Sequence, residues 1–404
     1  MQKDLDVDHG RVARSGDDDR RRRTLRRQRL SVSAVFFLTG AAFATWASRV
    51  PAVQDRLDLS AGELAIALIG LSGGAFVGLP LVGGLVARYG SRTVLCAGLA
   101  VYLAALAALA YAPGLAALTV LLALFACGNT AVDVAMNTQG VLVERAYERP
   151  VLGGFHAMFS LGGIAGAVAG GLAASADIGI GRHFPPAALA LSAVAAAAAT
   201  SMAPDPPRDT RDSGPMLALP GPGLWIPGLV AFCALMGEGV VNDWGAVYLR
   251  EVTGSSPGAA GLGYAVFSAG MVLGRLSADR IRTRLGTVRF TVACAALAGA
   301  GAVTPIASPT TPAGFTGYAL LGLGMAAVIP VVFAHAAARR PDTPGPAIAA
   351  VSAIGYVGFL AGPPLIGALA STTTLRTAML VLPTLMLTMG ILATRLRRPG
   401  SPPS

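Results

Sequence analysis

Long apolar runs separated by short polar segments dominate the chain from residue 31 to residue 394. A helix that crosses a bilayer needs about 20 consecutive, mostly apolar residues. Runs of this kind occur at residues 31–50, 62–87, 93–112, 115–143, 152–174, 185–203, 224–248, 258–279, 288–308, 312–337, 346–370 and 376–394. The pattern predicts an all-α membrane protein with twelve transmembrane helices. The first run is interpreted as a retained helix and not as a cleaved signal, because eleven further apolar segments follow it.

The composition agrees with a surface that faces lipid. Hydrophobic residues make up 54% of the chain and charged residues only 13%, whereas about a quarter of a soluble protein is charged. The 51 glycines and 27 prolines also fit, since both residues are more frequent in membrane helices than in soluble ones. The four cysteines lie singly in apolar runs, without zinc-ligand or redox spacing, and are interpreted as small core residues.

Basic residues distinguish the two predicted sides of the membrane. If the N-terminus is cytoplasmic, 26 of the 31 basic residues fall in cytoplasmic segments and five on the opposite side. Such an excess marks the cytoplasmic side, so the sequence predicts a multi-pass protein of the bacterial cytoplasmic membrane with both termini inside. The basic N-terminal segment is interpreted as a topogenic anchor that would also attract anionic lipid, and not as a nucleic-acid-binding tail.

A repeat divides the chain into two related halves. A shift of 196 residues superposes eight glycine pairs without gaps, among them Gly74 on Gly270 and Gly90 on Gly286. Such duplication is common in secondary transporters, so the halves predict two six-helix bundles with pseudo-twofold symmetry. The proposed regions are a basic cytoplasmic tail (1–30), an N-terminal bundle (31–203), a proline-rich cytoplasmic linker (204–223), a C-terminal bundle (224–395) and a cytoplasmic tail (396–404).

The predicted spans also differ in a pattern of three. Spans 3, 6, 9 and 12 lack ionisable carboxylates, amides and imidazoles within their apolar runs and are expected to face lipid. Spans 2, 5, 8 and 11 carry glycines four residues apart, which allow close helix packing, and are expected to provide smooth sliding surfaces. Deep polar groups concentrate in spans 4 and 7, which are expected to line a cavity.

This division resembles the major facilitator superfamily of membrane transporters, and several motifs agree with it. The segment after span 2 resembles the superfamily's gating loop through Gly83, Arg88, Gly90 and Arg92, but departs from it at Ala87, where the family usually has an acid, and at Ser91, which is usually basic. The equivalent loop of the second half contains Asp279 and Arg280. The strings from Asp133 to Glu144 and from Glu238 to Leu249 resemble a bacterial branch of uncharacterised inner-membrane proteins near the fucose-permease-like sugar:proton symporters.

Two polar clusters inside the spans are the first candidates for function. In span 7, Glu238 shares a helix face with Asn242, one turn further on. Ionisable residues in membrane helices usually face a bundle interior or a cavity, so Glu238 is interpreted as a proton-coupling or substrate-contact residue, with a structural carboxylate as the alternative. In span 4, Asn129, Asp133 and Asn137 form a polar stripe. This stripe either contacts substrate or holds helices together.

Other polar residues near the span ends have two interpretations each. His156, at the cytoplasmic start of span 5, is expected to approach Asn137 or Glu144 and either titrates near neutrality or only donates a structural hydrogen bond. Glu144 with Arg145, and likewise His335, are interpreted as structural.

Two tryptophans in the outer parts of spans 7 and 1 pose a similar choice. Asp243 and Trp244 lie in the outer part of span 7, where the indole either stacks on a sugar ring or joins the interfacial aromatic belt. Trp46 and Arg49 in span 1 pose the same choice, with Arg49 a potential partner for an acid in the other half.

These features together predict a secondary active transporter that works by alternating access. No phosphate-binding loop occurs and the only lysine is Lys3, which argues against an ATP-driven pump. The four dispersed histidines argue against an enzyme, which would need a paired nucleophile and base or clustered metal ligands. A transporter-like sensor that moves no solute is a further alternative.

The leading hypothesis is proton-coupled movement of a small polar solute such as a sugar, by a monomer without metal or cofactor. The alternative is proton-driven efflux of an amphipathic drug or secondary metabolite, which a large apolar cavity lined by Met136, Met236 and Phe232 would favour.

Overall fold

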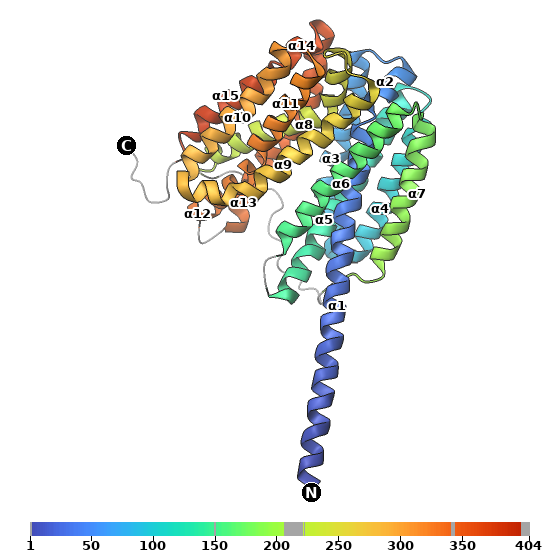
Figure 1. Cartoon of the computed structure of the whole chain (residues 1–404), viewed down its shortest axis with the longest axis vertical. Helices are drawn as coiled ribbons and strands as arrows, with labels where there is room; N and C mark the ends of the chain where they lie inside the picture. The colour runs from blue at the N-terminus through green and yellow to red at the C-terminus, as the bar shows by residue number, and fades with distance from the viewer. Residues whose placement is uncertain (1, 149–150, 206–220, 222, 341–343, 397–404) are drawn as a thin grey trace.

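The described part of the chain is built from α-helices. The computed structural model (Figure 1) describes residues 2–148, 151–205, 221, 223–340 and 344–396, without the side chains of residues 2–19, 79–80, 279 and 344–346. Its helices are α1 (Gln2–Ala47), α2 (Val50–Leu57), α3 (Ala61–Tyr89), α4 (Ser91–Leu109), α5 (Leu115–Tyr147), α6 (Leu152–Ser175), α7 (Ile180–Ala199), α8 (Trp225–Glu251), α9 (Pro257–Leu285), α10 (Thr287–Ala307), α11 (Thr311–Met325), α12 (Val328–Arg339), α13 (Pro344–Thr372), α14 (Leu375–Ala378) and α15 (Val381–Ala393).

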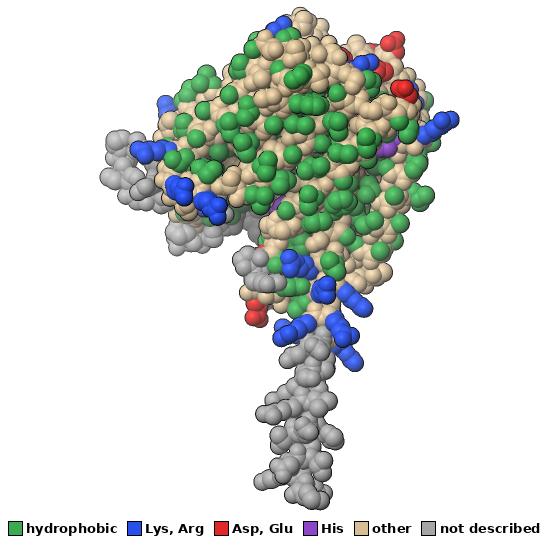
Figure 2. All heavy atoms as spheres, viewed as in Figure 1, with side chains coloured by type: hydrophobic (Ala, Val, Ile, Leu, Met, Phe, Trp, Pro, Cys, Tyr) green, Lys and Arg blue, Asp and Glu red, His purple; other side chains and the backbone are tan. Residues whose placement is uncertain are grey.

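Every predicted span has a helical counterpart. Eleven helical segments of the described chain are long and apolar enough to cross a membrane. The remaining predicted span, 185–203, corresponds to α7, whose hydropathy is lowered by Arg182, Pro185 and Pro186. Figure 2 shows hydrophobic side chains over the middle of the visible face, with arginines gathered toward the end from which α1 projects. The predicted all-α membrane fold is therefore confirmed.

Three predicted boundaries differ from the structure. The basic segment 1–30 was expected to be a separate tail, but from Gln2 onward it belongs to α1, which continues into the first span (Figure 1). Span 10 is broken between α11 and α12, and span 12 between α14 and α15. Most of the predicted linker and of the 396–404 tail lies outside the described residues.

The two halves repeat one pattern of helix packing. In the first half α1 packs on α6, α3 on α5 and α4 on α7; in the second half α8 packs on α13, α9 on α11 and α10 on α15. Gly90 and Gly286, 196 residues apart, join equivalent helices with φ angles of 87° and 76°. Glycine adopts such angles without the steric cost of a side chain. The duplication seen in the glycine pattern is thus present in the backbone.

Most of the glycines four residues apart hold each half together, whereas Gly171 on α6 and Gly258 and Gly261 on α9 lie against one another between the halves. A Cβ added at Gly74 of α3 would collide with the backbone of Ala123 on α5, and one at Gly162 of α6 with Phe37 on α1. Gly270 on α9 and Gly358 on α13 repeat these contacts in the second half, against α11 and α8. Small residues permit such backbone approach between membrane helices.

A different face of the same helices joins the halves, through α3 with α13 and α6 with α9. The hydroxyl of Ser72 on α3 donates a hydrogen bond of 2.8 Å to the carbonyl of Leu360 on α13. We call the end of the molecule that carries α2 and α14 the far end, and the end that carries Asp205 and Gly286 the linker end. Figure 1 shows the halves converging toward the far end.

We expect Gly74→Ala to destabilise the fold by about 1–3 kcal/mol, the usual cost of overpacking a well-packed contact. Thermal unfolding in detergent would measure the loss. The adjacent Gly73→Ala is the matched control, because a Cβ there meets no atom within 4 Å and alanine favours a helix. Equal melting temperatures for the two variants would contradict the role given to the ladder.

Candidate transport site between the two halves

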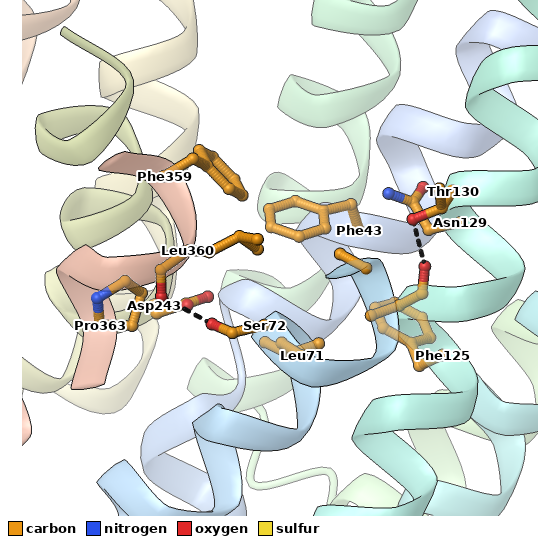
Figure 3. A pocket seen from close by; sticks show the side chains of 12 residues that line it. Phe43, Leu71, Ser72, Phe125, Asn129, Thr130, Asp243, Phe359, Leu360 and Pro363 are labelled. Atoms are coloured by element: carbon orange, nitrogen blue, oxygen red, sulfur yellow. Dashed lines mark hydrogen bonds between the residues drawn. The ribbon is translucent and has the colours of Figure 1, made fainter. Parts of the chain in front are cut away.

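A pocket lies where five helices from both halves meet (Figure 3). Its volume is about 80 Å³. Three phenylalanines from α1, α5 and α13 contribute apolar walls, and Asn129 and Asp243 contribute the amide and carboxyl groups. The lining residues are Phe43, Leu71, Ser72, Ala75, Phe125, Ala126, Asn129, Thr130, Asp243, Phe359, Leu360 and Pro363. The pocket therefore combines a small polar set with flat aromatic surfaces.

Three consecutive residues of α8 take different directions around this pocket. Asp243 lines the pocket and is 7% exposed. Its neighbour Asn242 is also buried, and its Oδ1 has no hydrogen-bond partner among the described residues. Trp244 is fully buried and donates from Nε1 to the carbonyl of Pro363 over 3.0 Å. Both interpretations of Trp244, as a sugar platform and as a belt residue, were wrong, because the indole is packed inside the second half.

Acidic groups from both halves approach the same tyrosine. Tyr356 on α13 lies within electrostatic range of Asp133 on α5 and of Glu238 on α8. Its side chain is 41% exposed. Asn137 donates from Nδ2 to Asp133 Oδ1 over 3.2 Å and to the Asp133 carbonyl over 2.8 Å. Asp133 of span 4 and Glu238 of span 7 thus belong to opposite halves, and the charge of each acts on Tyr356.

Arg275, which was not among the predicted site residues, lies close to Glu238 and contacts the other half. It lies inside α9, and its Nη1 donates over 2.9 Å to the hydroxyl of Ser160 on α6, across the halves. The guanidinium is also close enough to Glu238 and His156 for its charge to act on both. Position 79, its counterpart in the repeat, is leucine. An arginine at a position where the other half has leucine was the sequence signal that could have identified Arg275.

Of the two partners expected for His156, Glu144 is engaged elsewhere in the described structure, and the approach to Asn137 stays a prediction. The ring of His156 packs edge-on against Phe36 at 5.2 Å between centroids. Oε2 of Glu144 instead accepts hydrogen bonds from the backbone N–H groups of Val151 and Leu152, at 2.8 and 2.9 Å. Because these N–H groups open α6, the carboxylate caps that helix. The structural interpretation of Glu144 is the one that these contacts support.

Arg49 stabilises its own half and contacts no acid in the other. Its Nη2 donates to the carbonyl of Ile178 over 2.7 Å, and its Nη1 to that of Gly170 over 3.5 Å. These carbonyls lie at and just beyond the end of α6, where a cation is favoured. The expected partnership with an acid was wrong. Trp46 is fully buried, and its Nε1 has no hydrogen-bond partner within the described chain.

The gating-loop residues occupy the linker end. Gly83 and Arg88 lie in α3, where the Arg88 guanidinium is 5.2 Å from the Tyr89 ring centroid. Gly90 forms the turn into α4, and Arg92 lies in its first turn. In the second half Arg280 is exposed on α9, and the side chain of Asp279 lies outside the described part of the structure.

The departure at Ser91 has a clear structural reason. Ser91 donates from its hydroxyl and, over 3.0 Å, from its N–H to the carboxylate of Asp205, and the N–H of Arg92 follows at 3.4 Å. Gln139, fully buried, donates to the Ser91 hydroxyl over 2.8 Å and pairs with the backbone of Ala203. These hydrogen bonds connect the residues after α7 to the start of α4. A basic side chain at position 91 would not fit this buried arrangement.

Two related helical halves around a polar pocket define a secondary transporter of the kind built from internal repeats. Comparison with known proteins agrees. The family model described as Major Facilitator Superfamily matches residues 228–404. An uncharacterised MFS-type transporter of Yersinia pestis is 33% identical over 92% of this chain and 96% of its own length. The chain belongs to the major facilitator superfamily, whose members are transporters and not enzymes.

Other relatives and solved structures support the same assignment. An uncharacterised transporter of Sinorhizobium fredii is 36% identical over 85% of this chain and 92% of its own length, and the membrane protein MosC of Rhizobium meliloti is 30% identical over 87% of each chain. The crystal structure of the nucleoside transporter NupG superposes with a TM-score of 0.73 at 12% identity, covering 91% of this chain and 98% of that one. A bacterial homologue of the lysosomal transporter Spinster gives 0.71 at 15%, covering 91% and 96%.

A polar contact at the far end is expected to hold the halves closed there. Gln54 of α2 donates from Nε2 to Glu251 Oε1 of α8 over 2.9 Å. A hydrogen bond to a charged group contributes about 1.5–3 kcal/mol, so Gln54→Ala should shift the ratio of far-end-open to far-end-closed molecules by about tenfold or more.

Spin labels on cysteines introduced at Asp177 and Thr373, in a variant without the native cysteines, would report this opening as a longer distance between the halves. Arg56→Ala is the control, because Arg56 donates to the Ala112 carbonyl of its own half. An unchanged distance distribution in Gln54→Ala would show that this contact does not hold the far end closed.

Proposed function

We propose that this protein moves a small polar solute together with protons, by alternating access at the pocket between its halves. The observation that carries the proposal is that the pocket is lined from both halves, with Asn129 of α5 and Asp243 of α8 among its residues, while the charges of Asp133 and Glu238, also from α5 and α8, both act on Tyr356. Ionisable groups inside membrane helices are costly and commonly mark proton and substrate pathways. A carboxyl group near the interface is well placed to link its protonation to the relative movement of the two halves.

The pocket chemistry supports a compact, ring-bearing polar solute. Phe43, Phe125 and Phe359 offer apolar faces, while Asn129 and Asp243 offer hydrogen-bonding groups. Sites for small molecules commonly combine such a mainly apolar lining with a few polar groups that fix orientation. Sugars fit this description, and so do nucleosides, which the structurally similar NupG is named for transporting. Substrate screening should begin with these two classes.

Efflux of an amphipathic compound is less well supported by the described residues. Phe232 and Met236 pack against Gly358 and Gly362 in the contact between α8 and α13, and Met136 is 2% exposed. The three residues that would have favoured an apolar drug cavity are thus engaged in helix packing. None of them lines the pocket between the halves.

We further propose that the linker end faces the cytoplasm of a bacterial cell and that the chain acts as a monomer. The arginine side chains visible at that end (Figure 2) support this orientation, since basic residues favour the cytoplasmic side. A monomer suffices because both halves of the pocket come from one chain. Neither metal nor cofactor has a role in this proposal, in which the proton gradient supplies the energy.

Glu238→Gln should abolish uptake driven by a pH gradient, because an amide cannot bind and release the proton. A thermal-shift screen of hexoses and nucleosides on the purified protein would first identify a solute, and flux would then be measured in proteoliposomes. Exchange of labelled for unlabelled solute at equal pH should persist in this variant, which separates lost coupling from lost folding. Glu63→Gln, in the far-end cap of α3, is the control. Undiminished gradient-driven uptake in Glu238→Gln would refute the assignment.

A further inference from the structure

In the first half, one of the chain's own carboxylates occupies a helix N-terminus at the linker end. Asp205 accepts hydrogen bonds from the N–H groups of Ser91 and Arg92, the first residues of α4. Helix N-termini favour anions, because their N–H groups are unpaired and the helix dipole is positive there. Gln139 on α5 closes this arrangement from behind by its bond to Ser91. We call the space at this helix N-terminus, beside Gln139, the slot. In the first half the slot is an anion site that the chain's own Asp205 occupies.

The second half repeats the frame of this slot. Gly286 has the same turn geometry as Gly90 and leads into α10, so Thr287 stands where Ser91 does. His335 stands 196 residues after Gln139. Thr200 and Thr394, which directly follow the last helix of each half, also correspond. Each donates its hydroxyl to the backbone carbonyl three residues earlier.

The two halves differ in what surrounds this helix N-terminus. Two cavities of about 370 and 360 Å³ meet here at His335 and Leu396. Their described lining contains no acidic side chain and includes the arginines Arg289, Arg339 and Arg395. The first residues of α10, Thr287 and Val288, form part of the same wall. Where the first half places a carboxylate, the described residues of the second half present basic side chains around the two cavities.

The donors in this wall suit an anion with several oxygens. His335 is 8% exposed, and its Nε2 accepts from Arg339 Nε over 3.2 Å, so the neutral ring carries its proton on Nδ1 and can donate from it. Arg289 and Arg395 stand on the two cavities that His335 joins. Arginine guanidinium groups match phosphate oxygens in geometry as well as charge. Within the described residues, no side chain caps the N–H groups that open α10, which are further potential donors.

We propose that this linker-end cavity is a binding site for a phosphate group, supplied by an anionic phospholipid headgroup or by free phosphate. Apolar residues stand beside the basic ones, with Ile226 and Pro227 on one cavity and Leu285 on the other. Basic pockets between membrane helices bind phospholipid headgroups, and an apolar rim beside the arginines matches such an amphipathic ligand. The site is separate from the transport pocket and does not depend on the transported solute.

The test compares charge removal inside and outside the cavity on the full-length protein in neutral detergent. The cavity pair is Arg289→Gln with Arg395→Gln. The control pair is Arg145→Gln with Arg284→Gln, which removes the same charge at the same end from two arginines that line neither cavity; all four arginines are exposed. Thermal unfolding is recorded with sodium phosphate against sodium chloride at equal ionic strength, and with phosphatidylglycerol against phosphatidylcholine in mixed micelles.

We expect phosphatidylglycerol, phosphate or both to raise the melting temperature of the parent and of the control pair. In the cavity pair the apparent affinity should fall about thirtyfold, as expected for two arginines near a phosphate-bearing surface. A response to phosphatidylglycerol alone identifies the lipid as the source, and a response to both probes identifies the phosphate group itself as sufficient.

Two results would overturn the proposal. One is a parent protein that responds to neither probe, which would mean that the slot is closed or filled by another part of the chain. The other is an equal loss of response in both pairs, which would reduce the effect to general surface charge. If the cavity pair does not fold, the single variants Arg289→Lys and Arg395→Gln, with bound phosphatidylglycerol counted by native mass spectrometry, decide between the same outcomes.

Discussion

Membrane helices must hold together without the hydrophobic effect that drives packing in water, because lipid tails are as apolar as the helix surfaces themselves. In this protein, close backbone contact at glycine meets that constraint. Gly74 and Gly162 in one half, and Gly270 and Gly358 in the other, each lie against the backbone of a neighbouring helix of the same half. Such contacts tolerate no side chain, so they fix the helices in one register. Each half can then move as a unit while a different face of the same helices forms the surface between halves.

The polar groups follow from this construction. A helix face that touches another backbone leaves little room for polar side chains. On α5 and α8, Asn129 and Asp243 therefore lie on other faces, where they line the pocket between the two halves. Asp133 and Glu238 approach Tyr356 there, and Arg275 bonds to Ser160 across the same surface. The costly groups of the chain thus lie where a relative movement of the halves changes their surroundings. Such placement is what coupling between a proton and a conformational change requires.

Most of the fold could be predicted from the sequence. The length and hydropathy of the apolar runs and the spacing of the glycines are local features, and they do not depend on how the helices pack. The acids of spans 4 and 7 could be identified for the same reason, since a charge inside an apolar run is conspicuous. What a side chain contacts could not be predicted. Trp244 turned inward to the Pro363 carbonyl, and Arg49 turned to the end of α6, because partners distant in sequence decided their orientation. Arg275 was missed since it lies near a basic loop, where one more arginine carries no signal.

The two halves share one pattern of helix packing, but their helices are interrupted at different places. α5 is continuous from Leu115 to Tyr147, whereas its counterpart is interrupted between α11 and α12, and the last span of the second half is interrupted again before Val381. An interrupted helix lacks part of its hydrogen-bond ladder and bends more easily there. The first half has one interruption, between α1 and α2, where α8 of the second half is continuous. The two halves can therefore bend at different places, the first near the far end and the second within its fourth and sixth spans.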